Sequence, residues 1–486
     1  MENNNNVSRN EEWRVELRGS ISPKERAAIE RVEMPQLDPA YRITCNEEVN
    51  QGITEEQAVR EATRCLDCNN PQCVTGCPVG IDIPKFIKNI ERRHFADAAA
   101  TLKETSSLPA VCGRVCPQEK QCESKCIRLK MKQPAVAIGY LERFAADWQR
   151  NSSEEEVVKM EPKNGIKVAV VGSGPSGLSF AGDMLKKGFD VTVFEALHEI
   201  GGVLKYGIPE FRLPNAVVDH EIEGLRKMGV DFQKDVLIGR TITYDDLHAM
   251  GFKGIFVGSG AGFPRFMNIP GENLNGVMSS NEYLTRINLM QAGRGGDTPV
   301  ITGDTVAVVG GGNTAMDSTR TALRMGAKRV ILVYRRSEAE MPARLEEIGH
   351  AKEEGVELMT LHNPVEYIGD EKGRVRAMKV QRMELGEPDA SGRRSPIPVE
   401  GAIEEIPVDV VVVAVGVSPN SLVPRSIDGL EVSRRGTIVV NDESMQSNIS
   451  DLYAGGDIVR GGATVILAMG DGRKAAQNMA KTLLEK

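Results

Sequence analysis

Two strand–turn–helix segments, each with a glycine-rich turn, constrain the fold of this chain more than any other feature. Residues 167–195 run from an apolar strand through a glycine turn and a helix to a second strand, and residues 305–336 repeat that order. Such βαβ units place a nucleotide pyrophosphate at the N-terminus of their helix. The sequence therefore predicts an α/β protein with two Rossmann-like nucleotide-binding domains.

The first turn has the G-x-G-x-x-G spacing, at Gly172, Gly174 and Gly177. These glycines allow a tight turn, close approach of a pyrophosphate and close packing of helix on strand. Glu195 ends the next strand, where a carboxylate can accept hydrogen bonds from ribose hydroxyls. Strand, helix and acidic residue together favour a nucleotide site over the alternative, a purely structural glycine turn.

The second turn follows the same plan, with its candidate nucleotide-binding residues at Gly310, Gly312, Asn313 and Ala315. Its next strand ends in Arg335 and Arg336 instead of an acidic residue. Arginine forks bind a 2′-phosphate, which a carboxylate would repel. This position predicts NADPH, although both arginines could instead be solvated surface charges.

The C-terminal region is predicted to return to the first nucleotide domain. An apolar strand at 408–416 leads to a segment with the run AGGDI, a glycine-rich turn and a final helix. Asp457 and Thr464 would lie there near the pyrophosphate and ring of a flavin. We therefore expect FAD in this domain, with helix capping as the alternative role for Asp457.

The cysteines form a second, independent constellation, because all nine lie between Cys45 and Cys126. Eight of them make two runs with short spacers, and Pro78 follows the last cysteine of the first run. Such runs are typical of [4Fe–4S] proteins. They predict two clusters with ligands exchanged between the runs, whereas zinc is the alternative that carries no electrons. Cys45 stands apart.

Composition excludes several functional classes. The net charge of −8 gives no basic footprint for nucleic acid and no attraction to anionic lipid. The longest apolar run, 408–417, contains an aspartate and is about half the length of a membrane-spanning helix. The polar start MENNNN does not have the pattern of a signal peptide. We expect a cytoplasmic protein.

The runs RCLDCNNPQCVTGCPVGIDIP, LPAVCGRVCPQEKQCESKC and AIGYLERF, followed by the two nucleotide fingerprints, resemble one family over nearly the whole chain. It is that of the small (beta) subunit of NADPH-dependent glutamate synthase. Its relatives include the N-terminal half of dihydropyrimidine dehydrogenase and the large subunit of NADH-dependent ferredoxin:NADP oxidoreductase. The resemblance implies an FAD/NAD(P)-linked reductase preceded by an α-helical iron–sulfur domain.

The resemblance also implies a ligand pattern that spacing alone leaves open. One cluster would be held by Cys65, Cys68, Cys73 and Cys126, and the other by Cys77, Cys116, Cys122 and Glu142. Cys112 would then be spare. A surface salt bridge is the alternative role for Glu142.

The expected domains follow from this order. They are a helical domain with two clusters (1–155), an FAD domain in two parts (156–295 and 409–486) and an NADPH domain between them (296–408). Hydride would pass from NADPH to FAD and electrons onward through the clusters, so no catalytic side chain is required.

The resemblance also implies that this chain alone should not make glutamate, because the sequence does not begin with the catalytic cysteine of the amidotransferase paired with this family and leaves no room for a (β/α)8 synthase domain. We therefore expect a larger synthase subunit, or another flavoprotein or ferredoxin, as partner. The alternative function is ferredoxin:NADP oxidoreduction, and the non-enzyme alternative is a zinc scaffold for interactions.

Overall fold

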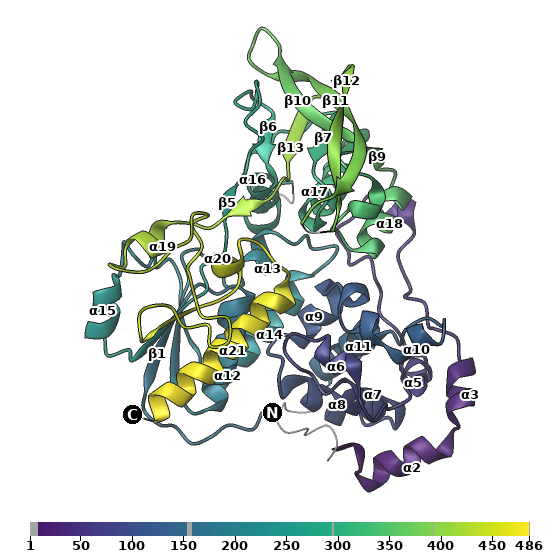
Figure 1. Cartoon of the computed structure of the whole chain (residues 1–486), viewed down its shortest axis with the longest axis vertical. Helices are drawn as coiled ribbons and strands as arrows, with labels where there is room; N and C mark the ends of the chain where they lie inside the picture. Colours follow the sequence, from purple (N-terminus) through teal and green to yellow (C-terminus); the bar gives the residue numbers. More distant parts are fainter. Residues whose placement is uncertain (1–7, 153–157, 294–295, 391, 486) are drawn as a thin grey trace.

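The computed structural model describes residues 8–152, 158–293, 296–390 and 392–485. Three parts are visible in Figure 1: a helical part at lower right, a first nucleotide domain at lower left and a second nucleotide domain above both. This arrangement confirms the predicted fold class.

The helical part spans residues 8–152 and contains short helices joined by loops. Their bounds are α2 Glu12–Ser20, α3 Pro23–Ala28, α4 Pro39–Arg42, α5 Glu55–Thr63, α6 Gln72–Thr75, α7 Ile83–Glu91, α8 Phe95–Lys103, α9 Pro109–Val115, η1 Gln118–Lys120, η2 Glu123–Lys125, α10 Ile127–Lys130 and α11 Ile138–Asn151. The apolar stretch 83–102 forms two helices, because Arg93 takes a left-handed φ of 62° between them. Phe86, Ile90 and Leu102 from this pair lie in the core.

The first nucleotide domain is a parallel sheet with helices on it. Its strands, in spatial order, are β15 Leu452–Ala454, β4 Gly254–Val257, β1 Lys167–Val171, β2 Asp190–Phe194 and β3 Asp231–Gln233. Its helices are α12 Pro175–Lys186, α13 Val203–Tyr206, α14 Asn215–Met228, α15 Tyr244–Ala249, α19 Leu422–Arg425, α20 Asp457–Arg460 and α21 Val465–Leu484. The C-terminal strand β15 thus completes a sheet that begins near residue 167.

The second nucleotide domain is also built on a parallel sheet. Its strands, in spatial order, are β6 Val277–Ser279, β13 Val410–Val413, β7 Thr305–Val309, β8 Arg329–Tyr334 and β9 Glu357–Thr360. Its helical elements are α16 Ser280–Leu284, η3 Thr285–Leu289, α17 Asn313–Arg324, η4 Glu338–Glu340 and α18 Leu345–Glu353. Strands β6 and β13 fall outside the range 296–408 expected for this domain. The chain therefore enters this sheet before residue 296 and leaves it after residue 408.

A three-stranded antiparallel sheet covers the top of the second domain in Figure 1. It consists of β10 His362–Gly369, β11 Val375–Pro388 and β12 Arg394–Pro407. The two-stranded pair β5 Phe263–Pro264 and β14 Val417–Ser418 lies where the chain passes between the two nucleotide domains. No pattern in the sequence indicated this antiparallel layer.

The final helix α21 packs along α12, the first helix of the fold's nucleotide-binding core. Gly472 makes this approach possible, because a Cβ there would collide with the carbonyl oxygen of Ser176. Helix α12 is buried from Pro175 to Leu185 as a result.

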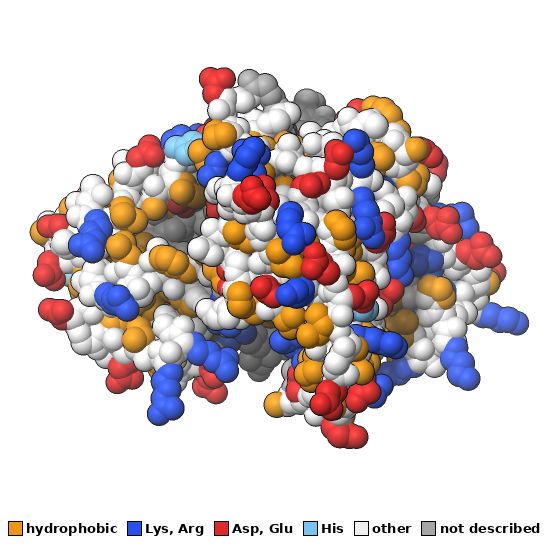
Figure 2. Space-filling model, turned by 90° about the horizontal axis from the view of Figure 1, so that it is seen from above, with side chains coloured by type: hydrophobic (Ala, Val, Ile, Leu, Met, Phe, Trp, Pro, Cys, Tyr) orange, Lys and Arg blue, Asp and Glu red, His pale blue; other side chains and the backbone are white. Residues whose placement is uncertain are grey.

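The surface carries both charge signs. Lysines and arginines alternate with acidic side chains over the face seen from above in Figure 2. Within the ranges that the structure describes, no helix is long and apolar enough to cross a bilayer.

Candidate functional site

A cavity of about 1000 Å³ opens between the two parallel sheets. Its lining includes the sequence-predicted residues Gly172, Gly174, Glu195, Asn313, Asp457 and Thr464. The predicted residues Gly177, Gly310, Gly312, Ala315, Arg335 and Arg336 are not part of this lining. The cavity is large enough for a cofactor, and residues from both nucleotide domains border it.

The first glycine turn has the geometry that its spacing predicts. Gly172 has a φ of 99°, and a Cβ on it would lie 2.6 Å from the carbonyl oxygen of Gly258. A Cβ on Gly177 would collide with the carbonyl oxygen of Gly172. At Gly174 a Cβ would meet nothing within 4 Å, and this glycine borders the cavity. The open space beside Gly174 forms a cradle at the edge of the cavity.

Glu195 lies at the edge of the cavity and holds the turn together. Its Oε2 accepts a hydrogen bond of 2.9 Å from the backbone N–H of Ser173, and its Oε1 accepts one of 2.9 Å from Leu197. The carboxylate thus combines a structural contact with a position from which it can also reach a ribose hydroxyl.

The C-terminal segment reaches the cavity as expected. Thr464 caps α21 by accepting a bond of 3.4 Å from the N–H of Leu467. Asp457 is the first residue of α20, and burial raises its pKa to about 6. Asp471 anchors this loop by accepting bonds from Gly456 N (3.0 Å) and from the Arg460 guanidinium. Capping of α20 by the Asp457 side chain is not observed, because the cap position is Gly456.

Among the helices that begin at the cavity are α12, α17 and α21, since Pro175, Asn313 and Thr464 all border it. The positive ends of their dipoles and their free N–H groups favour negatively charged ligands. This electrostatic arrangement suits phosphate groups.

The second glycine turn is equally tight, but the two arginines beyond it differ in their surroundings. Gly310 has a φ of 144°, and a Cβ there would collide with the Ala414 carbonyl oxygen. Arg335 is exposed. Arg336 is buried, and its guanidinium donates bonds of 2.7 Å to Arg394 O and to Asp389 Oδ2. Arg336 therefore ties β8 to the β11–β12 hairpin, and Arg335 keeps its guanidinium at the surface.

The first set of cysteines gathers in the helical part. Burial, together with the neighbouring thiols of Cys65, Cys126 and Cys68, raises the pKa of Cys73. Burial and the Cys126 thiol likewise raise the pKa of Cys68. Four side chains from two distant runs thus lie within electrostatic reach of one another.

The second set gathers around Glu142. Burial raises the pKa of this carboxyl to about 8, and its Oε1 has no hydrogen-bond partner among the described residues. Burial and this carboxylate also raise the pKa values of Cys77 and Cys122. At Cys116 the hydrogen bond to Cys112, followed by burial and the same carboxylate, raises the pKa of the thiol. Glu142 is only 6% exposed, so it does not form the surface salt bridge that was the alternative. An unpartnered buried oxygen among thiols fits a metal cluster.

Within the described residues, no group of three or more His, Cys, Asp or Glu is arranged to hold a metal ion. In a four-iron cluster each ligand binds a different iron atom, so its ligands stand farther apart than those of a single ion.

Helix α21 connects the second set with the cavity. Val115, next to Cys116, borders the cavity. Cys112 Sγ lies 3.5 Å from Met469 Sδ on α21. One residue on, a Cβ at Gly470 would lie 3.0 Å from the carbonyl oxygen of Pro78, which follows Cys77.

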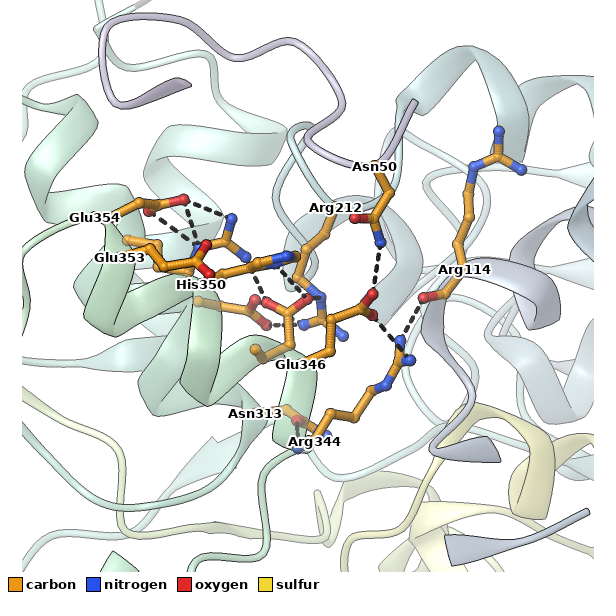
Figure 3. Close-up of polar contacts among 12 residues, drawn as sticks. Asn50, Arg114, Arg212, Asn313, Arg344, Glu346, His350, Glu353 and Glu354 are labelled. Carbon is orange, nitrogen blue, oxygen red and sulfur yellow. Dashed lines mark hydrogen bonds and ion pairs between the residues drawn. The ribbon is translucent and has the colours of Figure 1, made fainter. Parts of the chain in front are cut away.

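A buried ion pair at the cavity was not predicted from the sequence. Arg212 Nη1 lies 2.7 Å from both carboxylate oxygens of Asp317, which joins the two nucleotide domains. Figure 3 shows Arg212 in a wider network with residues of all three parts of the chain. The one sequence feature that could have indicated this pair is Asp317, a charged residue on the helix after the second turn.

Both the helical part and the nucleotide-binding part of the chain match known protein families. Residues 42–154 match the family described as dihydropyrimidine dehydrogenase domain II, 4Fe-4S cluster, and residues 166–472 match pyridine nucleotide-disulphide oxidoreductase. The chain is 36% identical to glutamate synthase [NADPH] small chain of Escherichia coli (strain K12), covering 94% of this chain and 98% of that one. It is 37% identical to NADP(+)-dependent formate dehydrogenase subunit beta of Moorella thermoacetica, covering 85% of this chain and 60% of that one.

Among solved structures, Mycobacterium tuberculosis FprA in complex with NADPH is similar with a TM-score of 0.56 and 20% identity, covering 66% of this chain and 85% of that one. This likeness concerns the fold of the two nucleotide domains. The near full-length match to the small chain of Escherichia coli, together with the two family models, shows that the chain belongs to the glutamate synthase small-chain family, in which a 4Fe-4S domain precedes a pyridine nucleotide-disulphide oxidoreductase.

Proposed function

We propose that this protein is an NADPH-oxidising flavoprotein that passes electrons through two [4Fe–4S] clusters to a partner. Bound FAD and clusters would supply the chemistry, since flavin takes two electrons as hydride and can release them singly to iron. The observation that carries the proposal is α21, which begins at the nucleotide cavity and contacts the cysteine segments further along.

The protein's own residues bind and orient these groups. The first turn, with Gly172, Gly174 and Gly177, would hold FAD together with Asp457 and Thr464. Helix N-termini would receive its pyrophosphate, and Glu195 its ribose. These roles rest on the cradle at Gly174 and on the shared cavity.

The second turn would hold NADPH, with Gly310, Gly312, Asn313 and Ala315 at the pyrophosphate. Arg335 would bind the 2′-phosphate, because its guanidinium is at the surface after β8. Arg336 would act one step away by holding the adjacent hairpin, because its bonds are already made within the protein.

The two cysteine sets would hold one cluster each. Cys65, Cys68, Cys73 and Cys126 would bind the first, and Cys77, Cys116, Cys122 and Glu142 the second. The second set adjoins the cavity through Val115, so it would receive electrons before the first set does. Cys112 would remain outside both sets, facing Met469.

Electrons then leave to a larger partner subunit. The relatives named above are small or beta subunits, and we infer the role of a glutamate synthase small subunit. Ferredoxin:NADP oxidoreduction with another flavoprotein is the second candidate. The zinc-scaffold alternative falls, because residues 42–154 match a 4Fe-4S domain. We also infer a cytoplasmic location, because thiols that bind iron–sulfur clusters must stay reduced, as they do in the cytosol.

The proposal is tested by anaerobic titration of the purified protein with NADPH, followed by absorbance and electron paramagnetic resonance (EPR). Flavin bleaching and reduced-cluster signals are expected, together with about eight iron atoms per chain for two four-iron clusters. Glu142→Leu should lower the iron content, whereas the exposed control Glu104→Leu should not. Protein that holds zinc, or no flavin, would contradict the proposal.

A further inference from the structure

We propose that Arg344 is a positioning residue that holds the second nucleotide turn against the segment carrying Cys116, so that nucleotide binding changes the energy of reducing the cluster held by the second set of cysteines. This inference rests on the proposed function and deepens it. Arg344 immediately precedes α18 and is 6% exposed.

On the nucleotide side, residues 342–345 lie against the second glycine turn. The backbone N–H of Arg344 donates a bond of 2.9 Å to Asn313 Oδ1 (Figure 3). The N–H of Ala343 donates one of 3.2 Å to the carbonyl oxygen of Gly311. Asn313 borders the cavity, so any ligand that moves the turn also moves this segment.

On the cluster side, the same arginine contacts the residues that flank Cys116. Its Nη1 donates a bond of 2.7 Å to Arg114 O, as Figure 3 shows, and its Nη2 donates one of 3.1 Å to Gln118 Oε1. Gln118 in turn donates a bond of 3.2 Å to Cys112 O. The guanidinium fork therefore fixes both ends of the loop around Cys116.

Neighbouring contacts keep the two segments together. Lys120 Nζ donates bonds of 3.0 and 2.9 Å to the carbonyl oxygens of Pro342 and Ala343. The N–H of Leu345 donates a bond of 3.3 Å to Glu119 Oε1. Arg344 is buried, and its side chain holds this segment directly to both flanks of Cys116. A lysine in its place could not reproduce the fork.

Coupling between two sites is reciprocal. If bound NADP⁺ changes the energy of reducing the cluster, cluster reduction must change the NADP⁺ dissociation constant by the same factor. The holoenzyme therefore offers two independent readouts of one contact. These are the ratio of NADP⁺ Kd values in the oxidised and reduced protein, and the EPR spectrum of the reduced cluster with and without NADP⁺.

The test compares Arg344→Lys and Arg344→Gln with Arg42→Gln. Arg42 is buried at the same domain boundary and bonds Glu353, Glu354 and His350 O, but it touches neither Asn313 nor the Cys116 loop. Wild type and Arg42→Gln are expected to show a Kd ratio different from one and a nucleotide-dependent EPR spectrum. Both Arg344 variants should bring the ratio to one, make the spectrum insensitive to NADP⁺, and weaken NADP⁺ binding about tenfold.

Wild-type coupling retained in the Arg344 variants, or equal loss in Arg42→Gln, would overturn the inference. If the Arg344 variants lose iron, Lys120→Met provides the second measurement, because Lys120 is exposed and its replacement removes two contacts between the same segments. It should reduce the Kd ratio, and an unchanged ratio would refute the inference. A wild-type ratio of one, with normal flavin reduction by NADPH, would refute Arg344 coupling alone. Absence of flavin reduction would instead refute the proposed function.

Discussion

Replacing Gly174 by alanine should weaken FAD binding but leave the protein folded. Gly174 precedes α12 with φ −69° and ψ 178°, a conformation open to any L-residue. A Cβ there meets no protein atom within 4 Å but enters space at the edge of the cavity. The fold should therefore accept the methyl group, and the pyrophosphate should not.

The structure sets the size of both effects. A glycine-to-alanine change at a compatible position stabilises a protein by about 0.4–1 kcal/mol through the unfolded chain. Displacing the pyrophosphate from one N–H donor at the start of α12 should cost about 1.5–3 kcal/mol, as for hydrogen bonds to charged groups. The dissociation constant for FAD should then rise roughly 10- to 150-fold.

The assay is titration of deflavinated protein with FAD, combined with thermal unfolding followed by circular dichroism. Gly224→Ala is the matched control, because a Cβ there also meets nothing within 4 Å and lies on α14, away from the cavity lining. Gly177→Ala should lose both stability and FAD, since its Cβ would collide with Gly172 O. Wild-type FAD affinity in Gly174→Ala would refute the assignment of the first turn.

The two arginines after β8, the Cys116 thiol and two buried carboxylates of the second nucleotide domain can each be tested by a separate measurement. Arg335→Ser should raise KM for NADPH about tenfold and leave KM for NADH unchanged in dye-reduction assays, whereas Arg336→Ser should mainly lower the thermal midpoint by breaking its bonds to the hairpin. The opposite pattern would exchange the two roles. Cys116→Ser should preserve stopped-flow flavin reduction by NADPH but abolish transfer to the partner, provided that circular dichroism and bound FAD are unchanged. Failure of flavin reduction in that folded variant would contradict the proposed order. Burial raises the pKa values of Glu347 and Glu354, but neighbouring arginines lower them further, to about 2. The stability that these carboxylates give the fold is therefore present above their unfolded pKa of 4.5 and is lost as pH falls toward 2. The thermal midpoint should drop over that window, and a constant midpoint would contradict this.

Local patterns allowed much of the site to be predicted. The spacing of Gly172, Gly174 and Gly177 specifies a turn within a single βαβ unit, so the sequence alone was enough. Asp457 and Thr464 also border the cavity as expected, because a parallel strand and the following helix direct them to the same edge.

Contacts between distant segments could not be predicted in the same way. The bonds of Arg336 run to residues 389 and 394 in a hairpin whose existence the sequence pattern did not reveal. Arg344 joins two parts of the chain that are more than two hundred positions apart, and no periodicity indicates such a pair. The apolar sequences of β6 and β13 would suit either parallel sheet, so only their hydrogen bonds show that they belong to the second one.

The return of the C-terminus to the first sheet has a consequence for biosynthesis. Strand β4 is buried along its whole length and pairs with β15, which is synthesised almost two hundred residues later. Until β15 and α21 leave the ribosome, β4 is an unpaired apolar edge, the kind of edge that recruits other strands. Nascent chains should therefore depend on chaperones until residues 452–484 have been made, and the cofactor cavity can close only after that point.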